Sequence, residues 1–181
     1  MNKRAGGCLG LLLAACLLVL PARALAVDAA AAVVIEQGSG RVLFAQNETE
    51  RLPMASTTKI MTALVTLENS CLADRLTIDP SCVGIEGSSA YLEAGEEQTV
   101  ENLLYALMLR SGNDAAEALA LHVGGTRDGF IELMNRRAES LGLMDTRFQN
   151  PHGLPAEGHY TTALDLAKIT ASKRRLNSLR K

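Results

Sequence analysis

The sequence holds a serine and a lysine spaced so that one could activate the other. Ser56-Thr57-Thr58-Lys59 is an S-x-x-K tetrad at the start of an apolar run. Residues three apart share one face of a helix, so Ser56 and Lys59 would lie together. A serine hydroxyl is a poor nucleophile at neutral pH, and a lysine amine can take its proton only when burial lowers the pKa of the amine. The tetrad predicts a nucleophile and its base; taken alone, it also fits a helix-capping serine beside a solvated lysine.

A second polar motif, Ser111-Gly112-Asn113, interrupts apolar helical sequence further along the chain. A serine hydroxyl at such a break can relay a proton, and an asparagine amide can hydrogen-bond a substrate amide. The simpler interpretation is a helix C-terminal turn with glycine in the left-handed region. Together the two motifs predict a serine acyl-transfer site in which Ser56, Lys59 and Ser111 are catalytic and Asn113 binds the substrate.

The segments that must position these residues are mostly helical. The run at 56–68 is apolar at the i, i+3, i+4 and i+7 positions and on almost every face, which indicates a buried helix. Thr99 and Thr162 are placed to cap the helices that follow them. Helices are predicted over 56–68, 100–109, 114–123, 127–141 and 163–171, a β-hairpin over 30–45 around Gly38-Ser39-Gly40, and loops over 71–91, with small strands, and 148–160.

Length and composition limit the class of protein. The 181 residues are 48% hydrophobic with a formal net charge of -2, which suits one globular domain and gives no sign of a nucleic-acid binder. Residues 1–26 combine a basic start, an apolar stretch and Ala24-Leu25-Ala26, the pattern of a secretory signal peptide. A membrane anchor or a first helix of the fold are the alternatives for this segment. Cleavage after Ala26 would leave 27–181 as an exported, soluble, extracytoplasmic domain.

The cysteines and histidines point to no cofactor. Cys71 and Cys82 would pair in an oxidising compartment or stay as two free core residues, and the sequence leaves both options open. Cys-x-x-Cys spacing is absent, so nothing suggests redox catalysis or zinc. His122, His152 and His159 lack an obvious third ligand for a metal ion. We therefore expect neither a metal nor a cofactor.

Several longer stretches carry more information than the two short motifs. They are MASTTKIMTAL at 54–64, EGSS at 86–89 with YL at 91–92 and GE at 95–96, LL at 103–104, ML at 108–109, SGNDAA at 111–116, NPHGL at 150–154 and GHYTTA at 158–163. In order and at family-like spacing over roughly residues 30–170, they resemble D-alanyl-D-alanine carboxypeptidases, the low-molecular-mass penicillin-binding proteins. The resemblance implies an α+β fold of the penicillin-binding-protein and β-lactamase type, with a helical cluster against an antiparallel sheet. It also implies that His152 and His159 are loop residues with a structural role.

The resemblance implies a role for each matching site residue. Ser56 would be acylated by the penultimate D-alanine carbonyl, Lys59 would activate it, Ser111 would pass a proton to the leaving D-alanine, and Asn113 would orient the substrate backbone. The implied partners are peptidoglycan stem pentapeptides ending in D-Ala-D-Ala, trimmed in cell-wall biogenesis, and β-lactam antibiotics that mimic them. Membrane association is implied only if the full-length protein has an anchor.

One element of the family pattern is missing. In the family, K-T-G lies on a strand well beyond S-x-N, its lysine binds the substrate carboxylate, and that strand edge completes the oxyanion hole. Lys-Thr-Gly does not occur in this sequence. We therefore expect 27–181 to be the N-terminal portion of a carboxypeptidase domain, C-terminally truncated before its closing strands, with little or no activity alone. The basic run at 172–181 then indicates a shifted reading frame or an artificial terminus rather than a frayed helix end.

Two other functions stay open at this point. A serine β-lactamase of class A carries S-D-N and a glutamate that activates the deacylating water, whereas this chain has Ser-Gly-Asn and no stretch like that glutamate loop. A non-catalytic relative that binds peptidoglycan peptides, or an inert fragment, fits the missing K-T-G. Slow or fast turnover of a penicilloyl adduct would separate carboxypeptidase from lactamase.

Overall fold

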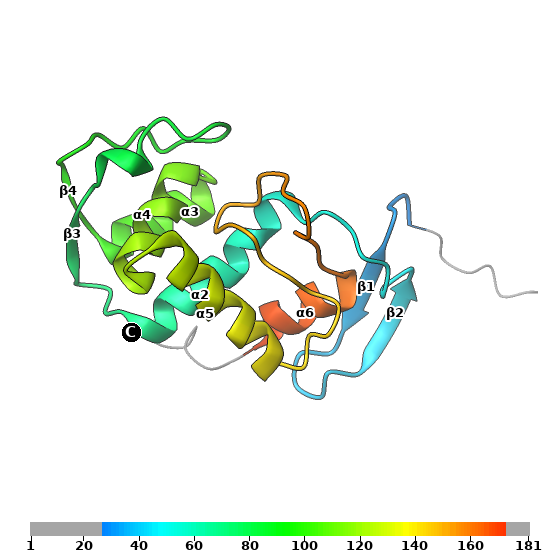
Figure 1. Cartoon of the computed structure of the whole chain (residues 1–181). Coiled ribbons are helices and arrows are strands. Elements are labelled where there is room, and N and C mark those ends of the chain that lie inside the picture. Colours follow the sequence, from blue (N-terminus) through cyan, green and yellow to red (C-terminus); the bar gives the residue numbers. More distant parts are fainter. Residues whose placement is uncertain (1–26, 173–181) are drawn as a thin grey trace, which may run out of the picture.

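The computed structural model describes residues 27–172, so the predicted signal peptide at 1–26 and most of the basic end lie outside the described residues. Helices fill the middle of this part of the chain, and a small two-stranded sheet stands at each end (Figure 1). The helices are α2 (Thr58–Asn69), α3 (Val100–Leu109), α4 (Asn113–Gly124), α5 (Arg127–Ser140) and α6 (Ala163–Ala171), with 3-10 turns η1 (Ala55–Thr57) and η2 (Pro80–Cys82). The strands are β1 (Ala32–Ile35), β2 (Val42–Gln46), β3 (Arg75–Thr77) and β4 (Glu97–Thr99).

The predicted β-hairpin is present. β1 and β2 pair antiparallel, with Val33 opposite Ala45 and a bulge between Val34 and Ile35. Gly40 closes the turn at a φ of 73°, a conformation that glycine adopts without steric penalty. α6 packs against β1, so the last helix that the structure describes covers the first strand (Figure 1). This combination of a helical cluster with small antiparallel sheets confirms the predicted α+β class.

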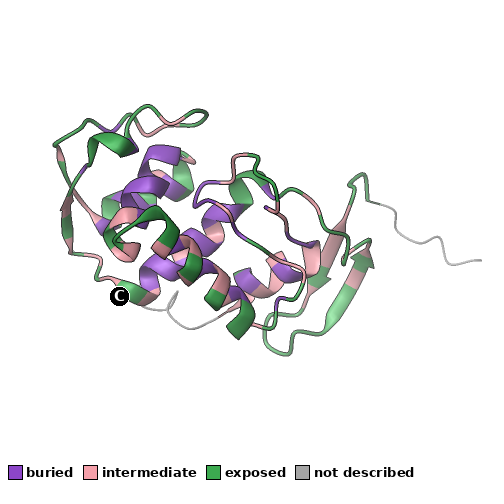
Figure 2. Ribbon diagram, in the orientation of Figure 1, coloured by how far each residue is buried: buried purple, intermediate pink, exposed green. Residues whose placement is uncertain are grey.

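Helix α2 runs through the middle of the molecule and joins two apolar clusters, and the buried segments in Figure 2 gather around it. Its Leu67 packs with residues of α3 and α4, whereas Met61, Leu64 and Val65 pack with residues of α5 and α6. Because apolar side chains on opposite sides of α2 are buried, the prediction of a buried helix is confirmed. This burial fixes α2 in place, and α2 carries the S-x-x-K lysine.

The helix ends follow the capping residues in the sequence. Thr99 Oγ1 accepts from the N–H of Asn102 at 3.1 Å, and Thr162 Oγ1 accepts from the N–H of Asp165 at 3.1 Å, as predicted. Gly125 follows α4 with a φ of 70°, in the left-handed region where glycine ends a helix readily. The helix boundaries therefore agree with the predictions to within a few residues; the predicted first helix begins later than expected, because Ser56 lies in η1, two residues before α2 begins.

The region 71–99 differs most from what the sequence predicts. β3 confirms a small strand there, but its partner β4, which ends where α3 begins, was not predicted. Cys71 and Cys82 are both free in the structure, and of these two only Cys82 is a core residue, because Cys71 is exposed. Burial raises the pKa of the Cys82 thiol to about 11, so it stays protonated. None of the helices within 27–172 is long and apolar enough to cross a bilayer.

Candidate active site

The nucleophile candidate lies on a strained turn. Ser56 is in η1, and the preceding Ala55 has a φ of 44°, in a region that residues with a side chain seldom adopt. Such a conformation costs on the order of 1–3 kcal/mol and persists only where the surrounding structure enforces it. The Ser56 side chain is exposed, so a substrate can reach its hydroxyl. The turn therefore presents Ser56 to solvent at the head of a buried helix.

Lys59 is buried one turn further, with its side chain directed back toward the serine. Only 2% of Lys59 is exposed, and its Nζ lies 3.4 Å from Ser56 Oγ. Nζ also donates to Asn113 Oδ1 at 2.7 Å and to the backbone carbonyl of His152 at 2.8 Å. Burial lowers the pKa of Lys59 to about 8, although the negative charge of Asp114 opposes the shift. With this pKa, roughly a tenth of the amine is neutral at pH 7, and the neutral form is the one that a general base requires.

Ser111 reaches the same point from the other side of the site. It lies between α3 and α4 with a φ of 57°, another left-handed conformation at a residue that is not glycine. Its hydroxyl donates to Ser56 Oγ at 3.1 Å. The structure thus brings together two hydroxyls and one amine from segments 55 residues apart, as the two motifs predict.

Asn113 holds the site together. It is the first residue of α4 and is buried, with 4% exposed. Its Oδ1 accepts from Lys59, its Nδ2 donates to the carbonyl of Glu86 at 2.6 Å, and its backbone N–H donates to the carbonyl of Ser88 at 2.8 Å. The side chain therefore binds the base and the 86–89 loop at once; contact with a substrate amide remains a prediction.

Asp114, the next residue, was missed by the sequence analysis. It is 2% exposed and accepts from Ser89 Oγ at 2.6 Å and from the N–H groups of Ala90 and Leu92 at 3.0 and 3.2 Å. Burial alone would raise the pKa of this carboxyl, but the hydrogen bonds lower it, so it stays ionised. Asp114 thus fixes the loop at 88–92 beside the serines. An acidic residue among buried alanines at the start of a helix was the available signal.

The loop at 150–154 covers the nucleophile turn, that is, η1 with Ser56. Asn150 Oδ1 accepts from the N–H of Gly153 at 2.6 Å, and Thr62 Oγ1 donates to the carbonyl of Pro151 at 2.6 Å. Gly153 has a φ of 97°, and a Cβ placed there would lie 1.8 Å from the carbonyl oxygen of Ala55. Only glycine allows this approach, so the loop and the serine turn are in direct backbone contact.

The histidines at this loop are structural contacts within the site. His159 Nδ1 accepts from the N–H of Gln149 at 3.0 Å, which leaves the proton of the neutral ring on Nε2, 2.9 Å from Thr58 Oγ1. Burial, with a contribution from His152, lowers the pKa of His159 to about 4, so its ring is neutral.

Within residues 27–172, no group of three or more His, Cys, Asp or Glu side chains could hold a metal ion.

A cavity of about 260 Å³ opens in front of the serine. Its lining comes from the nucleophile turn, the 86–89 loop, α4 and the 150–154 loop: Ala55, Ser56, Gly87, Ser88, Asn113, His152, Gly153, Leu154 and Pro155. Among the described residues that line it, none is a lysine or an arginine. The cavity therefore offers a serine hydroxyl and hydrogen-bonding groups, but no lysine or arginine to pair with a carboxylate.

The structure thus combines an α+β fold with a cavity at which Ser56, Lys59 and Ser111 meet. The family model described as D-alanyl-D-alanine carboxypeptidase (peptidase S11) matches residues 19–180. The chain belongs to this family of serine-type D-alanyl-D-alanine carboxypeptidases.

Individual relatives agree with this assignment. The chain is 40% identical to D-alanyl-D-alanine carboxypeptidase DacF of Bacillus subtilis over 162 residues, covering 87% of this chain and 42% of that protein. It is 41% identical to DacC of Escherichia coli, covering 79% of this chain and 38% of the relative. The chain therefore spans about two fifths of the length of these curated relatives.

Solved structures give the same result in three dimensions. The D-alanyl-D-alanine carboxypeptidase DacD of Francisella tularensis matches with a TM-score of 0.79 and 37% identity, over 82% of this chain and 37% of that one. A mutant of the Streptomyces K15 DD-transpeptidase matches with a TM-score of 0.77 and 37% identity, over 81% of this chain and 61% of that one. The structure thus corresponds to part of the penicillin-binding-protein fold.

Proposed function

We propose that this chain carries the acylation site of a serine-type D-Ala-D-Ala carboxypeptidase. The observation that carries the proposal is the meeting of three groups, since Ser56 Oγ lies 3.4 Å from a buried amine and accepts from Ser111 Oγ at 3.1 Å. Neutral Lys59 can take the proton of Ser56 as its Oγ attacks a carbonyl carbon. Asn113 and the carbonyl of His152 hold the amine in place for this step.

The leaving group needs a proton, and Ser111 is placed to deliver it. Attack on the penultimate D-alanine carbonyl forms an ester at Ser56 Oγ and breaks the C–N bond to the terminal D-alanine. The proton that Lys59 took from Ser56 returns through the Ser111 hydroxyl to the departing nitrogen. Water then hydrolyses the ester, which regenerates Ser56 and releases the shortened peptide.

The substrate and the compartment follow from the family. The relatives are named for cleavage at D-alanyl-D-alanine, and one solved neighbour from Haemophilus influenzae is a penicillin binding protein. We infer that the substrate is a peptidoglycan stem pentapeptide, that β-lactams acylate Ser56 in its place, and that the site works outside the cytoplasm in cell-wall biogenesis. The predicted signal peptide at 1–26 supports that location.

A second candidate is a relative that binds the stem peptide without turning it over. It is favoured by the absence of Lys-Thr-Gly from the sequence and by a cavity lining without a lysine or an arginine among the described residues. A peptide carboxylate would then meet hydrogen-bond donors but no lysine or arginine. We therefore expect slow turnover of peptide substrates by this chain alone, even where the serine is reactive.

Release of D-alanine from a synthetic peptide ending in D-Ala-D-Ala tests the proposal. Slow release by the chain, abolished in Ser56→Ala, supports acyl transfer at Ser56 with incomplete substrate binding. Binding of the peptide by a folded chain without any release would favour the binding function. Turnover as fast as that of the full-length relatives would refute the expectation that this chain alone is nearly inactive.

A further inference from the structure

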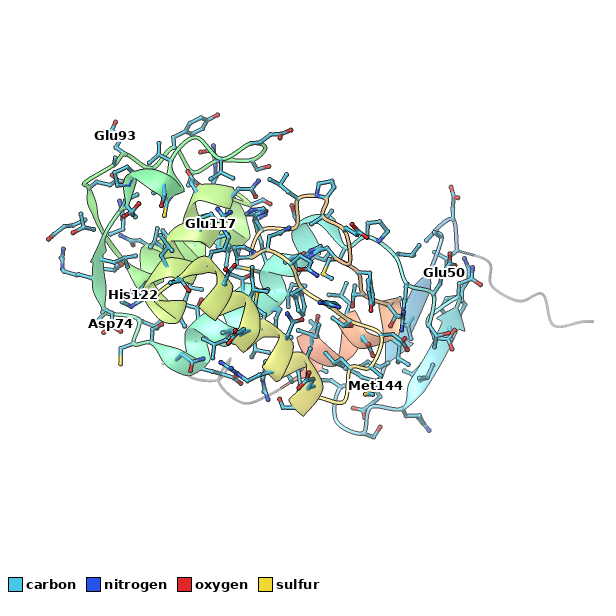
Figure 3. The ribbon with its side chains drawn as sticks, in the orientation of Figure 1. Glu50, Asp74, Glu93, Glu117, His122 and Met144 are labelled. Atoms are coloured by element: carbon cyan, nitrogen blue, oxygen red, sulfur yellow. The ribbon has the colours of Figure 1, made fainter. Side chains whose placement is uncertain are left out.

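Glu117 is a buried carboxylate behind the site, and no step of the proposed acyl transfer uses it. It lies on α4 (Figure 3) with 2% of the residue exposed. Its Oε2 accepts from Arg127 Nε at 2.9 Å, and its Oε1 lies 3.1 Å from His152 Nε2 without the geometry of a hydrogen bond. A buried ion pair is weak evidence for stability, because well-packed apolar side chains of similar volume often stabilise as much or more. A contribution to stability therefore does not explain why a carboxylate is buried at this position.

The ring of His152 has a hydrogen bond on one side and a close contact with the Glu117 carboxylate on the other. Nδ1 accepts from the N–H of Leu154 at 3.1 Å, so the proton of the neutral ring is on Nε2, the atom that faces Glu117. His152 is 7% exposed, which leaves the ring little room to turn. The side chain is thereby held between its own loop and α4.

The backbone of the same residue touches the catalytic lysine. The carbonyl of His152 accepts from Lys59 Nζ at 2.8 Å, and Asn113 Oδ1 accepts at 2.7 Å. With these two directions of Nζ occupied, the third points to Ser56 Oγ at 3.4 Å. A shift of the His152 carbonyl would therefore turn the amine away from the serine.

We propose that Glu117, held by Arg127, is a positioning residue for Lys59: it anchors the side chain of His152 and thereby the carbonyl that orients the lysine amine. A continuous line of contacts then connects the half-exposed Arg127 with the nucleophile. Its consequence for catalysis rests on the proposed function, whereas the effect on Lys59 itself does not.

Other titratable groups also face this line of contacts. Asp114 on α4 adds negative charge near Lys59, and His159 adds a neutral ring near His152. Removing the charge of Glu117 leaves Asp114 in place. A change in the pKa of Lys59 would therefore come from the lost Glu117 charge and from movement of the His152 carbonyl. In the native chain the Glu117 charge and the His152 carbonyl both stabilise the ammonium form of Lys59, so the loss of either lowers its pKa.

The test is the titration of Lys59 followed by the NMR signal of its ¹³Cε in the full chain. The sequence has five lysines, and Lys59→Arg identifies the Lys59 signal by its loss. In Glu117→Gln we expect the pKa of Lys59 to fall by about 0.5 unit or more. Arg127→Met should shift it in the same direction by less, and this variant keeps the test valid if Glu117→Gln does not fold.

Glu68→Gln is the matched control. It breaks a half-buried ion pair between α2 and α5, in which Arg137 Nη2 lies 2.8 Å from Glu68 Oε1, away from the site. It should leave the Lys59 titration unchanged. An unchanged Lys59 titration in folded Glu117→Gln and Arg127→Met, or an equal shift in Glu68→Gln, would overturn the proposal.

The NMR measurement does not require acylation, so failure of the proposed function leaves this test intact. If the chain is acylated by penicillin, a second readout becomes available. Glu117→Gln should then move the midpoint of the rate against pH to lower pH and lower the plateau rate by about tenfold. A purely structural role would reduce the folded fraction without moving the midpoint.

Discussion

The two faces of helix α2 differ in how completely they are covered. On one face Thr58, Lys59 and Thr62 are buried, and each has a partner in the loops at 150–159 or on α4. On the other face lies an apolar groove of about 260 Å³ between α2, α3 and α6, lined by Ile60, Ala63, Leu64, Leu67, Leu104, Met108, Ile169 and Thr170. The polar chemistry is thus assembled within the described residues, whereas the apolar face is open.

The open face continues along the first sheet. A second groove, of about 610 Å³, lies between β1 and α6, and Val33, Ile35 and Leu166 help to line it. Within residues 27–172, β1 pairs only with β2, so its other edge has no strand beside it. An open strand edge beside apolar surface is a site of association in other proteins. The contrast predicts large effects from substitutions around Lys59 and small ones at the exposed side chains that line the grooves.

The largest effect is expected from Lys59→Met. This substitution removes the proposed base and leaves the oxygens of Asn113 and His152 without their donor. We expect the rate of acylation by a fluorescent penicillin to fall roughly a thousandfold. Lys168→Met is the control, because that lysine is partly exposed and pairs with Asp165 on α6, away from the site. Similar rates in the wild type and Lys59→Met would mean that the lysine is not the base.

A backbone substitution tests the contact between the loop and the nucleophile turn. Gly153→Ala would place a Cβ 1.8 Å from the Ala55 carbonyl, whereas the space around Gly125 is open at a similarly positive φ. We expect Gly153→Ala to lower the free energy of unfolding by about 3 kcal/mol or more, and Gly125→Ala by about 1 kcal/mol. Urea denaturation measures both. Equal losses would show that the close contact with Ala55 does not matter.

The lysine should also make stability depend on pH. Its pKa is about 8 in the folded chain and 10.5 as the reference value, so between these values the unfolded chain binds more protons. The contribution of Lys59 to the free energy of unfolding should therefore rise by about 2 kcal/mol between pH 8 and pH 10. The raised pKa of Cys82 acts in the opposite direction, and it does so equally in the wild type and in Lys59→Met. Urea denaturation of the wild type and Lys59→Met at both values isolates this contribution. The same slope in both proteins would contradict the lowered pKa.

The smallest effect is expected in the apolar groove. Met108 lines it with 50% exposure, whereas the neighbouring Leu107 on α3 is 1% exposed and belongs to the core. Met108→Gln should change the free energy of unfolding by less than about 0.5 kcal/mol, and Leu107→Ala should lower it by roughly 2–5 kcal/mol. A large loss in Met108→Gln would mean that the groove is packed in solution.

Local patterns in the sequence predicted the helices and half of the site. Spacing of three places Ser56 and Lys59 on one face, and threonine caps mark where α3 and α6 begin. No local rule joins Ser111 to Ser56 across 55 residues; the two polar motifs taken together, and then the family resemblance, predicted that pairing, and the structure places their hydroxyls 3.1 Å apart.

The remaining contacts had weak signals or none. The His152 carbonyl is a backbone group, and every residue has one, so its role toward Lys59 leaves no mark in the sequence. β4 is three polar residues whose pairing with β3 is set by tertiary structure rather than by propensity. Glu117 could have been noticed in the sequence, since it lies in a run of alanines and leucines on a buried helix. A lone charge in such a run indicates a partner elsewhere in the chain.

The most direct test of the preassembled acylation site is the intact mass of the folded chain after incubation with benzylpenicillin. We predict one covalent adduct on the wild type, lost slowly, and none on Ser56→Ala. Rapid loss of the adduct would indicate a β-lactamase. A folded wild-type chain that gains no adduct, or an equal adduct on Ser56→Ala, would contradict the assignment of Ser56, Lys59 and Ser111 as the acylation site.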